Sequence, residues 1–364
     1  MKLHCQTGVK NNFGDALNEW LWPCLLPAMW DDDGTVFVGI GTILDRNIPE
    51  ASLRVVFGSG TGYALPPDTT VGQWRIYGVR GPLTAQVLRL PPGLALTDPA
   101  ILLRELEEFK VPKSGATLFV PHWKSVHYGS WQAICEELGI EFVDPCGDSR
   151  DIVRRIAGAK KVIAESMHAA IIADAFRVPW VPIALSREVS PFKWADWSLS
   201  LGLDYEPFCL PPSNATEAMR DRLLRGSHFE GIFAYPPADE ITGLHTLRFS
   251  DTDQLMRDNE VICARCEQAW QKAFGNITGA AFKRVAAVSR AGDRARGRRF
   301  ERAYRALAMV ATMPGTLSTD HSHDQAMVRT QAALERLKFD WSHGFSAQAR
   351  PEISPKTLRA VGLL

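Results

Sequence analysis

The chain has 364 residues, of which 46% are hydrophobic and 23% are charged, an ordinary composition for a folded soluble protein. Its 41 basic and 41 acidic residues balance, which excludes a globally charged nucleic-acid binder. No run of about 18 apolar residues predicts a membrane span, and residues 1–10 lack the pattern of a secretory signal. The seven cysteines lack the spacing of a disulfide framework, so we expect a cytoplasmic protein.

The first third of the chain alternates short apolar or β-branched runs with turns and helices. Strands are expected at residues 2–6, 35–40, 54–57 and 75–79, and helices at 15–26 and 83–90. This alternation predicts a parallel sheet with helices on its faces.

The middle third repeats the theme more regularly. Strands are expected at 117–120, 140–143, 161–164 and 180–183, with helices at 130–138, 149–157 and 168–176. Ser149 is the expected N-cap of the second helix. The turn at 110–115 combines proline and glycine and is the best joint between domains. We therefore predict an α/β protein of two Rossmann-like domains, 1–110 and 111–210, facing each other.

Beyond about residue 204 the pattern changes to proline-rich turns and long helical stretches, 252–274 and 280–311. We expect a helical extension over 211–364 that packs back on the core, with its tail beyond Pro314 partly disordered. Residues 283–305 are basic, which fits either a solvated helix face or a surface for anionic lipid head groups. The one close cysteine pair, Cys263 and Cys266, lacks a second pair and fits ordinary helix residues better than a zinc site.

Two polar stretches lie after strands of the first half. Asn12, Gly14 and Asp15 precede a helix, whose N-terminal amides and dipole suit an anion, although Asp15 could also simply cap its own helix. A glycine-rich segment follows the third strand and either clears room for a substrate or makes tight turns; it contains Gly58, Ser59 and Gly60. It fits neither the dinucleotide fingerprint nor a phosphate loop.

Arg80 and Asp98 are the charged candidates of the first half. Arg80 ends a strand beside Gly81, where a guanidinium grips a carboxylate or phosphate through two hydrogen bonds, unless it is an ordinary surface residue. Asp98 precedes Pro99. Its carboxylate either acts on a sugar hydroxyl or caps a turn.

Three further groups lie in the second half. His122, Lys124 and Ser125 follow a strand and are all suitable phosphate partners. Ser166 and His168 lie where a strand turns into an apolar helix. The pKa of an imidazolium there falls unless an anion binds, which suits a general acid better than a core histidine.

A last group follows the final strand. Lys193 could pair with a donor carboxylate. Trp194 and Trp197 either stack on sugar rings or pack the domain against the helical tail.

Taken in order, six segments within residues 2–201 resemble the polysaccharide pyruvyl transferase family, and most closely the bacterial exopolysaccharide ketal pyruvate transferases such as those of succinoglycan assembly. The segments are NNFGDALN, GIGTIL, VFGSGTGY, YGVRGPLTAQVL, LTDPAILL and ESMHAAIIADAFRVPWVPI. The resemblance implies a GT-B-like fold, phosphoenolpyruvate as co-substrate, and no required metal or cofactor.

The resemblance also carries over two residues and shows one departure. The family's catalytic histidine falls on His168 and its strand-end arginine on Arg80. Many members have an arginine two residues before the histidine, where this chain has Ser166. The donor's negative charge must then be met elsewhere, and Lys193, His122 and Lys124 are the candidates.

The expected reaction moves a pyruvyl group from phosphoenolpyruvate to a sugar of an exopolysaccharide repeat unit and forms a pyruvate ketal. The sequence leaves open whether the oligosaccharide acceptor is lipid-linked, which would bring the protein to the inner face of the membrane. Two alternatives remain: a GT-B-type glycosyltransferase that uses a nucleotide sugar, and a non-catalytic glycan-binding assembly subunit. No nucleic-acid partner is expected.

Overall fold

The structure is a computed structural model that describes residues 1–5, 12–31, 33–186, 189–218, 221, 245–247, 249, 251–271 and 301–345. Most of the helix expected at 280–311 and of the basic stretch 283–305 lies outside these residues, as do the side chains of Cys263 and Cys266.

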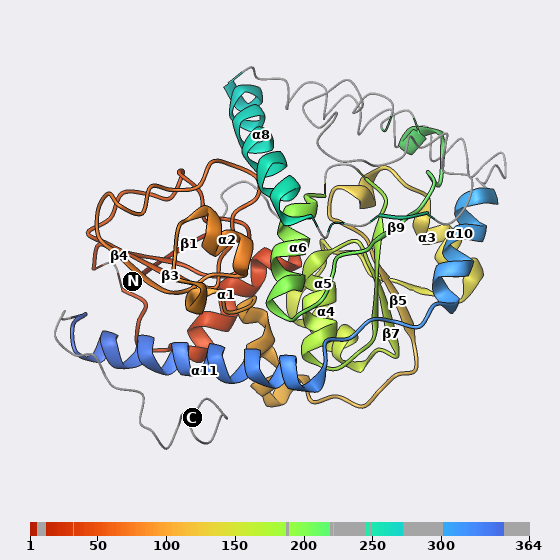
Figure 1. Ribbon diagram of the computed structural model, residues 1–364. Coiled ribbons are helices and arrows are strands. Elements are labelled where there is room, and N and C mark those ends of the chain that lie inside the picture. The colour runs from red at the N-terminus through yellow and green to blue at the C-terminus, as the bar shows by residue number, and fades with distance from the viewer. Residues whose placement is uncertain are drawn as a thin grey trace.

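The first half contains a four-stranded parallel sheet in the order β1-β2-β3-β4 (Figure 1). Its elements follow the chain as β1 (Lys2–His4), α1 (Phe13–Leu25), β2 (Thr35–Val38), β3 (Leu53–Phe57), β4 (Trp74–Gly78) and α2 (Pro82–Val87). Three short 3₁₀ helices then lead to the second half: η1 (Pro92–Leu94), η2 (Pro99–Glu105) and η3 (Glu107–Phe109). The turn at 110–115 lies between the two sheets.

The second half contains a six-stranded sheet in the order β10-β9-β8-β7-β5-β6, parallel except for β10. Its elements begin with β5 (Thr117–Val120), η4 (Ser125–His127), α3 (Trp131–Leu138), β6 (Glu141–Phe142), α4 (Ser149–Gly158) and β7 (Lys161–Ala164). They continue with α5 (Met167–Ala175), β8 (Trp180–Ala184), α6 (Pro191–Ser200), β9 (Phe208–Cys209) and β10 (His245–Thr246).

The strand order of the second sheet reverses between β5 and β7. From β5 the chain passes to β6 on one side and then crosses back to β7 on the other. At such a point the connections that leave the two neighbouring strands diverge, and open parallel sheets bind ligands in the crevice between them. A ligand site is therefore expected at the segments that follow β5 and β7.

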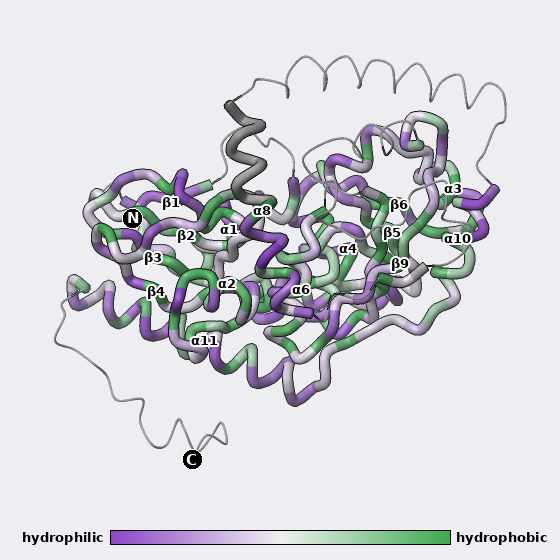
Figure 2. The backbone as a smooth tube through the Cα atoms, turned by 45° about the horizontal axis from the view of Figure 1, so that its top comes forward, coloured by the Kyte–Doolittle hydropathy of each residue, from purple (hydrophilic) through white to green (hydrophobic). Residues whose placement is uncertain are grey.

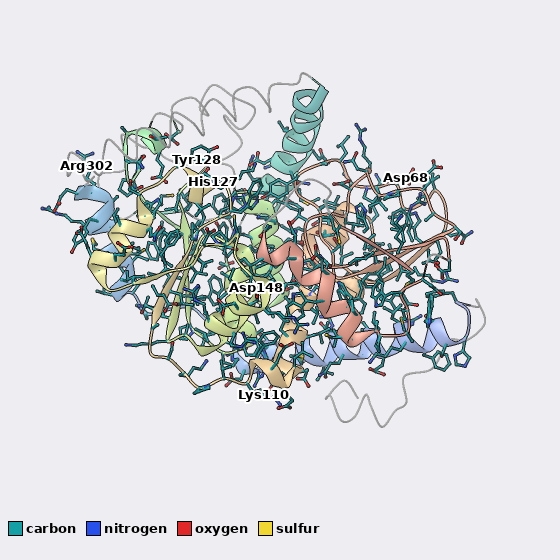
Figure 3. The ribbon with its side chains drawn as sticks, turned by 180° about the vertical axis from the view of Figure 1, so that it is seen from behind. Asp68, Lys110, His127, Tyr128, Asp148 and Arg302 are labelled. Atoms are coloured by element: carbon teal, nitrogen blue, oxygen red, sulfur yellow. The ribbon has the colours of Figure 1, made fainter. Side chains whose placement is uncertain are left out.

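Local capping explains where α4 begins. The N-cap is Asp148, whose carboxylate accepts a hydrogen bond from the Asp151 amide at 2.8 Å, so the expected cap at Ser149 was wrong by one residue. The Ser149 hydroxyl instead donates to the Phe13 carbonyl at 2.9 Å. Figure 3 labels Asp148 near the middle of the molecule. The start of α4 is thus tied to the start of α1.

One continuous apolar cluster crosses both halves. It includes Val55 and Phe57 of β3, Val162 and Ala164 of β7, and every apolar residue of α5, which is buried all around. Helix α1 packs on α4, α2 packs on α6, and η2 packs on α5. The predicted α/β class with parallel sheets is confirmed, and the two halves meet through close helix packing.

A long helix, α11 (Asp320–Ser342), runs along both halves (Figure 1). It buries a stripe at helical spacing, formed by His323, Ala326, Met327, Thr330, Leu334 and Leu337. Hydrophilic and hydrophobic segments alternate along it in Figure 2. This stripe gives the helix a face to bury, so the tail that was expected to be partly disordered beyond Pro314 contains an ordered helix; residues 346–364 lie outside the described part.

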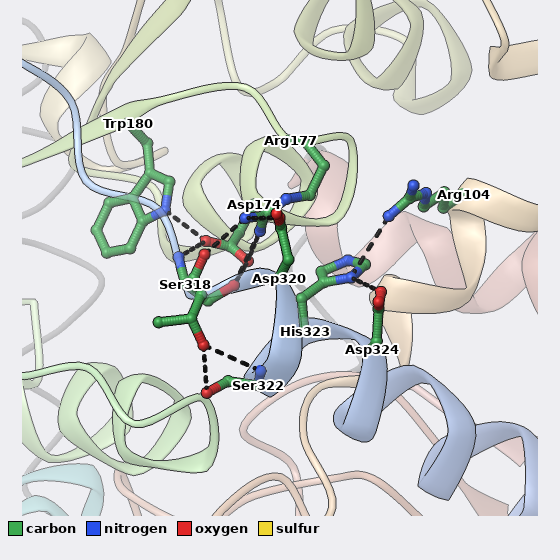
Figure 4. Close-up of polar contacts among 10 residues, drawn as sticks. Arg104, Asp174, Arg177, Trp180, Ser318, Asp320, Ser322, His323 and Asp324 are labelled. Carbon is green, nitrogen blue, oxygen red and sulfur yellow. Dashed lines mark hydrogen bonds and ion pairs between the residues drawn. The ribbon is translucent and has the colours of Figure 1, made fainter. Parts of the chain in front are cut away.

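Both ends of α11 are fastened to the rest of the protein. Near its start, the buried Asp174 carboxylate accepts from the Ser318 amide and hydroxyl and from the Trp180 indole (Figure 4). Near its end, the Tyr77 hydroxyl of β4 donates to Asp340 at 2.7 Å. The helix thus joins the second sheet at one end and the first sheet at the other.

Two further helices are α8 (Thr252–Gln271) and α10 (Glu301–Thr312). Helix α10 covers an apolar cluster of the second half through Leu307 and Val310, which lie with Phe119 and Trp131. Across the residues with assigned structure, no helix is both long and apolar enough to span a lipid bilayer.

Candidate active site

His168 lies in the first turn of α5, directly after β7, at the strand reversal. The backbone amides of Glu165 and Ser166 both donate to the Val120 carbonyl at the end of β5, which fixes the turn between strand and helix. Ser166 is the N-cap, with extended backbone and no side-chain cap bond. The first amides of a helix have no acceptor within it, so this end offers N–H groups beside the imidazole.

Asp98 faces His168 from the first half. It caps η2, where its Oδ1 accepts from the Ala100 amide at 3.0 Å, and its Oδ2 lies 3.7 Å from His168 Nε2. Both of these atoms are buried and have no hydrogen-bond partner among the described residues. Buried polar atoms are nearly always partnered in proteins, so this pair is a candidate for proton transfer or ligand binding.

Burial shifts the two groups in opposite directions. It lowers the pKa of His168 to about 3, an effect to which the positive charges of Lys193 and Arg80 add. It raises the pKa of Asp98 to about 6, against the hydrogen bond from Ala100 and the charge of Arg80. At neutral pH the unliganded pair is a neutral imidazole beside a carboxylate, and a bound anion would favour the imidazolium.

The N-terminus of α1 packs directly on the imidazole. A Cβ at Gly14 would lie 2.0 Å from His168 Nδ1, so only glycine fits here. Asn12 is the N-cap, with its side chain accepting from the Gly14 amide at 3.3 Å, and its Nδ2 donates to Asp15 at 2.8 Å. Asp15 is therefore not the cap of its own helix, and burial raises its pKa, against the Asn12 hydrogen bond and the charge of Lys193.

Arg80 is fully buried and its guanidinium is bonded within the protein. Its Nε donates to Asp196 of α6 at 3.1 Å, one Nη donates to the Thr42 hydroxyl at 2.8 Å, and the other donates to the Thr61 carbonyl at 3.0 Å. The structure places Arg80 close enough to affect the pKa of His168, but as part of an ion pair.

The glycine-rich segment after β3 shapes the wall around Asp98 and Arg80. A Cβ at Gly58 would lie 2.1 Å from the Pro99 ring, and one at Gly60 would lie 2.3 Å from the Arg80 guanidinium carbon. The buried Ser59 hydroxyl donates to the Gly41 carbonyl at 3.0 Å. These residues therefore pack against the charged groups and hold the loops in place.

Lys193 lies in the first turn of α6 and is mostly buried. Its ammonium lies 5.1 Å from the centroid of the half-buried Tyr63 ring, a cation–π contact. Its positive charge lowers the pKa of both His168 and Asp15.

His122, Lys124 and Ser125 follow β5 on the other side of the strand reversal. The Glu165 carboxylate accepts from the His122 amide at 2.8 Å and from the Leu185 amide at 3.1 Å. It therefore joins the segments after β5, β7 and β8. Ser125 is buried, and the Lys124 ammonium lies over the half-buried Trp123 ring. Figure 3 labels His127 and Tyr128 further along this segment.

Trp194 and Trp197 lie in the core instead of at the site. They are 0% and 1% exposed, and their rings contact Trp180, while Trp194 stacks on Tyr205. Neither ring offers a face to a sugar in this structure, and the packing interpretation left open by the sequence describes them.

Two buried carboxylates were not assigned a role from the sequence. Glu165 lies in the same ESMH segment as His168. Its position directly after a buried strand was the feature of the sequence that could have identified it as a site residue. Asp196 follows Lys193 by one helical turn, and that spacing would have placed both on one face of α6.

Burial raises the pKa of Glu165 to about 7, against the hydrogen bonds from His122, Ser125 and Leu185. A raised carboxyl pKa means that its contribution to folding stability is fully present below the unfolded value of 4.5 and is lost as pH rises through 7. The difference corresponds to about 3 kcal/mol. We expect wild type to lose about that much stability relative to Glu165→Gln between pH 4.5 and 8, in urea unfolding at several pH values. Parallel pH profiles would contradict the shift.

The site is thus a buried imidazole–carboxylate pair at the strand reversal of the second sheet, with the N-termini of α5 and α1 beside the imidazole. Within the described ranges, no three His, Cys, Asp or Glu side chains are grouped to hold a metal ion.

Comparison with known proteins gives the family. The model of the polysaccharide pyruvyl transferase family matches residues 69–187. The succinoglycan biosynthesis protein ExoV of Rhizobium meliloti (strain 1021) is 42% identical over 236 residues, 64% of this chain and 73% of that protein. No solved structure matches the chain. The chain belongs to the polysaccharide pyruvyl transferase family and is a polysaccharide pyruvyltransferase.

Proposed function

We propose that this enzyme transfers the pyruvyl group of phosphoenolpyruvate to two hydroxyls of one sugar in an exopolysaccharide repeat unit, forming a cyclic ketal. The observation that carries the proposal is the His168–Asp98 pair, whose facing atoms are buried and have no hydrogen-bond partner among the described residues. The α1 and α5 N-termini add amide dipoles that favour an anion. The donor would then lie between the two halves, as in a GT-B-like arrangement.

In the proposed reaction a proton adds to the methylene carbon of phosphoenolpyruvate, and the central carbon becomes electrophilic. The first sugar hydroxyl attacks that carbon and loses its proton. The second hydroxyl then attacks the same carbon, the bond to phosphate breaks, and inorganic phosphate leaves with the second proton. The two sugar hydroxyls release two protons. One balances the proton added to the methylene carbon, and the other leaves on phosphate, so the reaction needs no oxidant or cofactor.

His168 would supply the proton to carbon. Its imidazole is neutral in the unliganded protein, and the charges of a bound donor raise its pKa into the range of a general acid. Asp98 would stabilise the imidazolium from 3.7 Å, and Nε2, which makes no hydrogen bond to the described residues, would carry the proton, while Nδ1 faces the α1 end. His122, Lys124, Ser125 and Ser166 remain candidates for the donor's phosphate, at the strand reversal.

Product mass tests the proposal. Incubated with phosphoenolpyruvate and an oligosaccharide of the repeat unit, the enzyme is expected to add about 70 Da to the acceptor and to release one phosphate per product. Addition of about 162 Da with a nucleotide sugar would instead identify a glycosyltransferase. Lipid-linked and free acceptors compared in the same assay show which form the enzyme uses.

A further inference from the structure

Helix α6 belongs to the second half by sequence, since it follows β8, yet it is fastened to the first half. It packs on α2, and in Figure 1 it lies between the two sheets. The fully buried Asp196 makes the attachment. Its Oδ1 accepts from the Thr84 amide at 2.9 Å, and its Oδ2 accepts from the Thr84 hydroxyl at 2.7 Å and from Arg80 Nε at 3.1 Å.

This attachment decides whether Arg80 or Lys193 is available to bind a ligand. Asp196 and Arg80 are both 0% exposed and form a neutral pair, and the rest of the guanidinium is bonded to Thr42 and Thr61. Breaking such a pair leaves an uncompensated buried charge, which is strongly unfavourable. Arg80 is therefore held in place, and Lys193, one turn before Asp196 on the same helix face, is a cation that could meet one anionic group of a donor.

The first turn of α6 carries a second feature of an anion subsite. Ser190 is the N-cap of this ten-residue helix, but it makes no side-chain cap bond. Its hydroxyl is buried, and no partner for it exists among the described residues. A ligand oxygen would provide the missing acceptor at the same helix end that carries Lys193, three residues further along the chain.

We propose that the first turn of α6 is the subsite for one anionic group of the donor, with Ser190 and Lys193 as its ligands and Asp196 as the positioning residue that fixes the turn against the first half. This inference rests on the proposed use of phosphoenolpyruvate. It assigns to Lys193 of α6 the positive charge that the family's arginine would supply at position 166. The Arg80–Asp196 ion pair then holds α6 in place.

Steady-state kinetics of three variants tests the subsite. Lys193→Met is expected to raise the KM for phosphoenolpyruvate about ten- to a hundredfold with a smaller fall in kcat, as for the loss of a charge-assisted hydrogen bond. Ser190→Ala raises KM by a smaller factor. Asp196→Asn is expected to raise the KM for phosphoenolpyruvate by about the same factor as Lys193→Met. The matched control is Asp174→Asn, another buried hydrogen-bonded carboxylate, on α5, which lowers stability but leaves this KM unchanged.

A double-mutant cycle tests whether Asp196 acts through Lys193. In the Lys193→Met background, Asp196→Asn is expected to leave the KM for phosphoenolpyruvate unchanged. Additive effects, or a KM that falls because Arg80 is released to bind the donor, overturn the proposal. If Asp196→Asn does not fold, Thr84→Val, which removes one hydrogen bond to Asp196, replaces it in the cycle.

Thermal shifts separate this proposal from the proposed function. Phosphoenolpyruvate is expected to raise the melting temperature of wild type and of Asp174→Asn, and to do so less for Lys193→Met. If wild type shows neither a shift nor turnover with phosphoenolpyruvate, the proposed function fails. If wild type responds and all α6 variants respond equally, only the α6 subsite fails.

Discussion

Replacing His168 with alanine is expected to lower turnover by about 10²–10⁴-fold, the usual contribution of one positioned acid. The imidazole stands at the α5 N-terminus with Asp98 at 3.7 Å, and none of the described hydrogen bonds of the fold depends on its Nε2. The variant should therefore stay folded. Phosphate release from phosphoenolpyruvate in the presence of acceptor measures the loss.

The matched control for this variant is His323→Ala. His323 is likewise a buried histidine whose Nε2 has no partner within the part of the chain that the structure describes, but it lies on α11 beside Arg104 (Figure 4). We expect it to change stability and to leave turnover near that of wild type. Phosphate release at the wild-type rate in His168→Ala would remove this residue from the mechanism.

Gly14→Ala is the second substitution with a large expected effect. The added methyl would lie 2.0 Å from His168 Nδ1 and 2.4 Å from its Cγ, far inside any van der Waals contact. Gly14 does not have a positive φ, and alanine favours a helix over glycine by about 1 kcal/mol, so the backbone itself accepts the change. The methyl must displace the imidazole from Asp98, and we expect a loss of turnover comparable to that of His168→Ala.

Gly93→Ala is the control for the added methyl group. A Cβ at Gly93 meets nothing within 4 Å, and the residue has no positive φ. It should behave as wild type in phosphate release and in thermal unfolding. Wild-type turnover in Gly14→Ala would mean that the imidazole position seen here is not the one used in catalysis.

The strands of the second sheet were predictable because buried parallel strands are short apolar runs bounded by turns. Residues 117–120 and 161–164 were predicted as strands with their observed bounds. The order of the strands in the sheet, by contrast, follows only in part from βα alternation. Placement of His168 at a strand end was available from the same pattern. The start of α4 at Ser149 was also predicted, whereas its N-cap was placed one residue too late because Asp148 and Ser149 are both good caps.

The partners of the site residues could not be read from the sequence. Asp98 meets His168 only because η2 packs on α5, and Arg80 meets Asp196 only because α6 packs on α2. Sequence patterns report which face of a helix is apolar but not which element covers it. For the same reason the two tryptophans of α6 had two possible roles, and burial in the core decided between them.

The fastening of α11 to both sheets has a consequence for how the protein is made. Asp174 and Tyr77 leave the ribosome well before their partners Ser318 and Asp340, which follow them by 144 and 263 residues. The nascent protein can pair its strands before then. The link between the two sheets forms only once α11 has emerged, so it is completed after the segments that carry His168 and Asp98 have been translated.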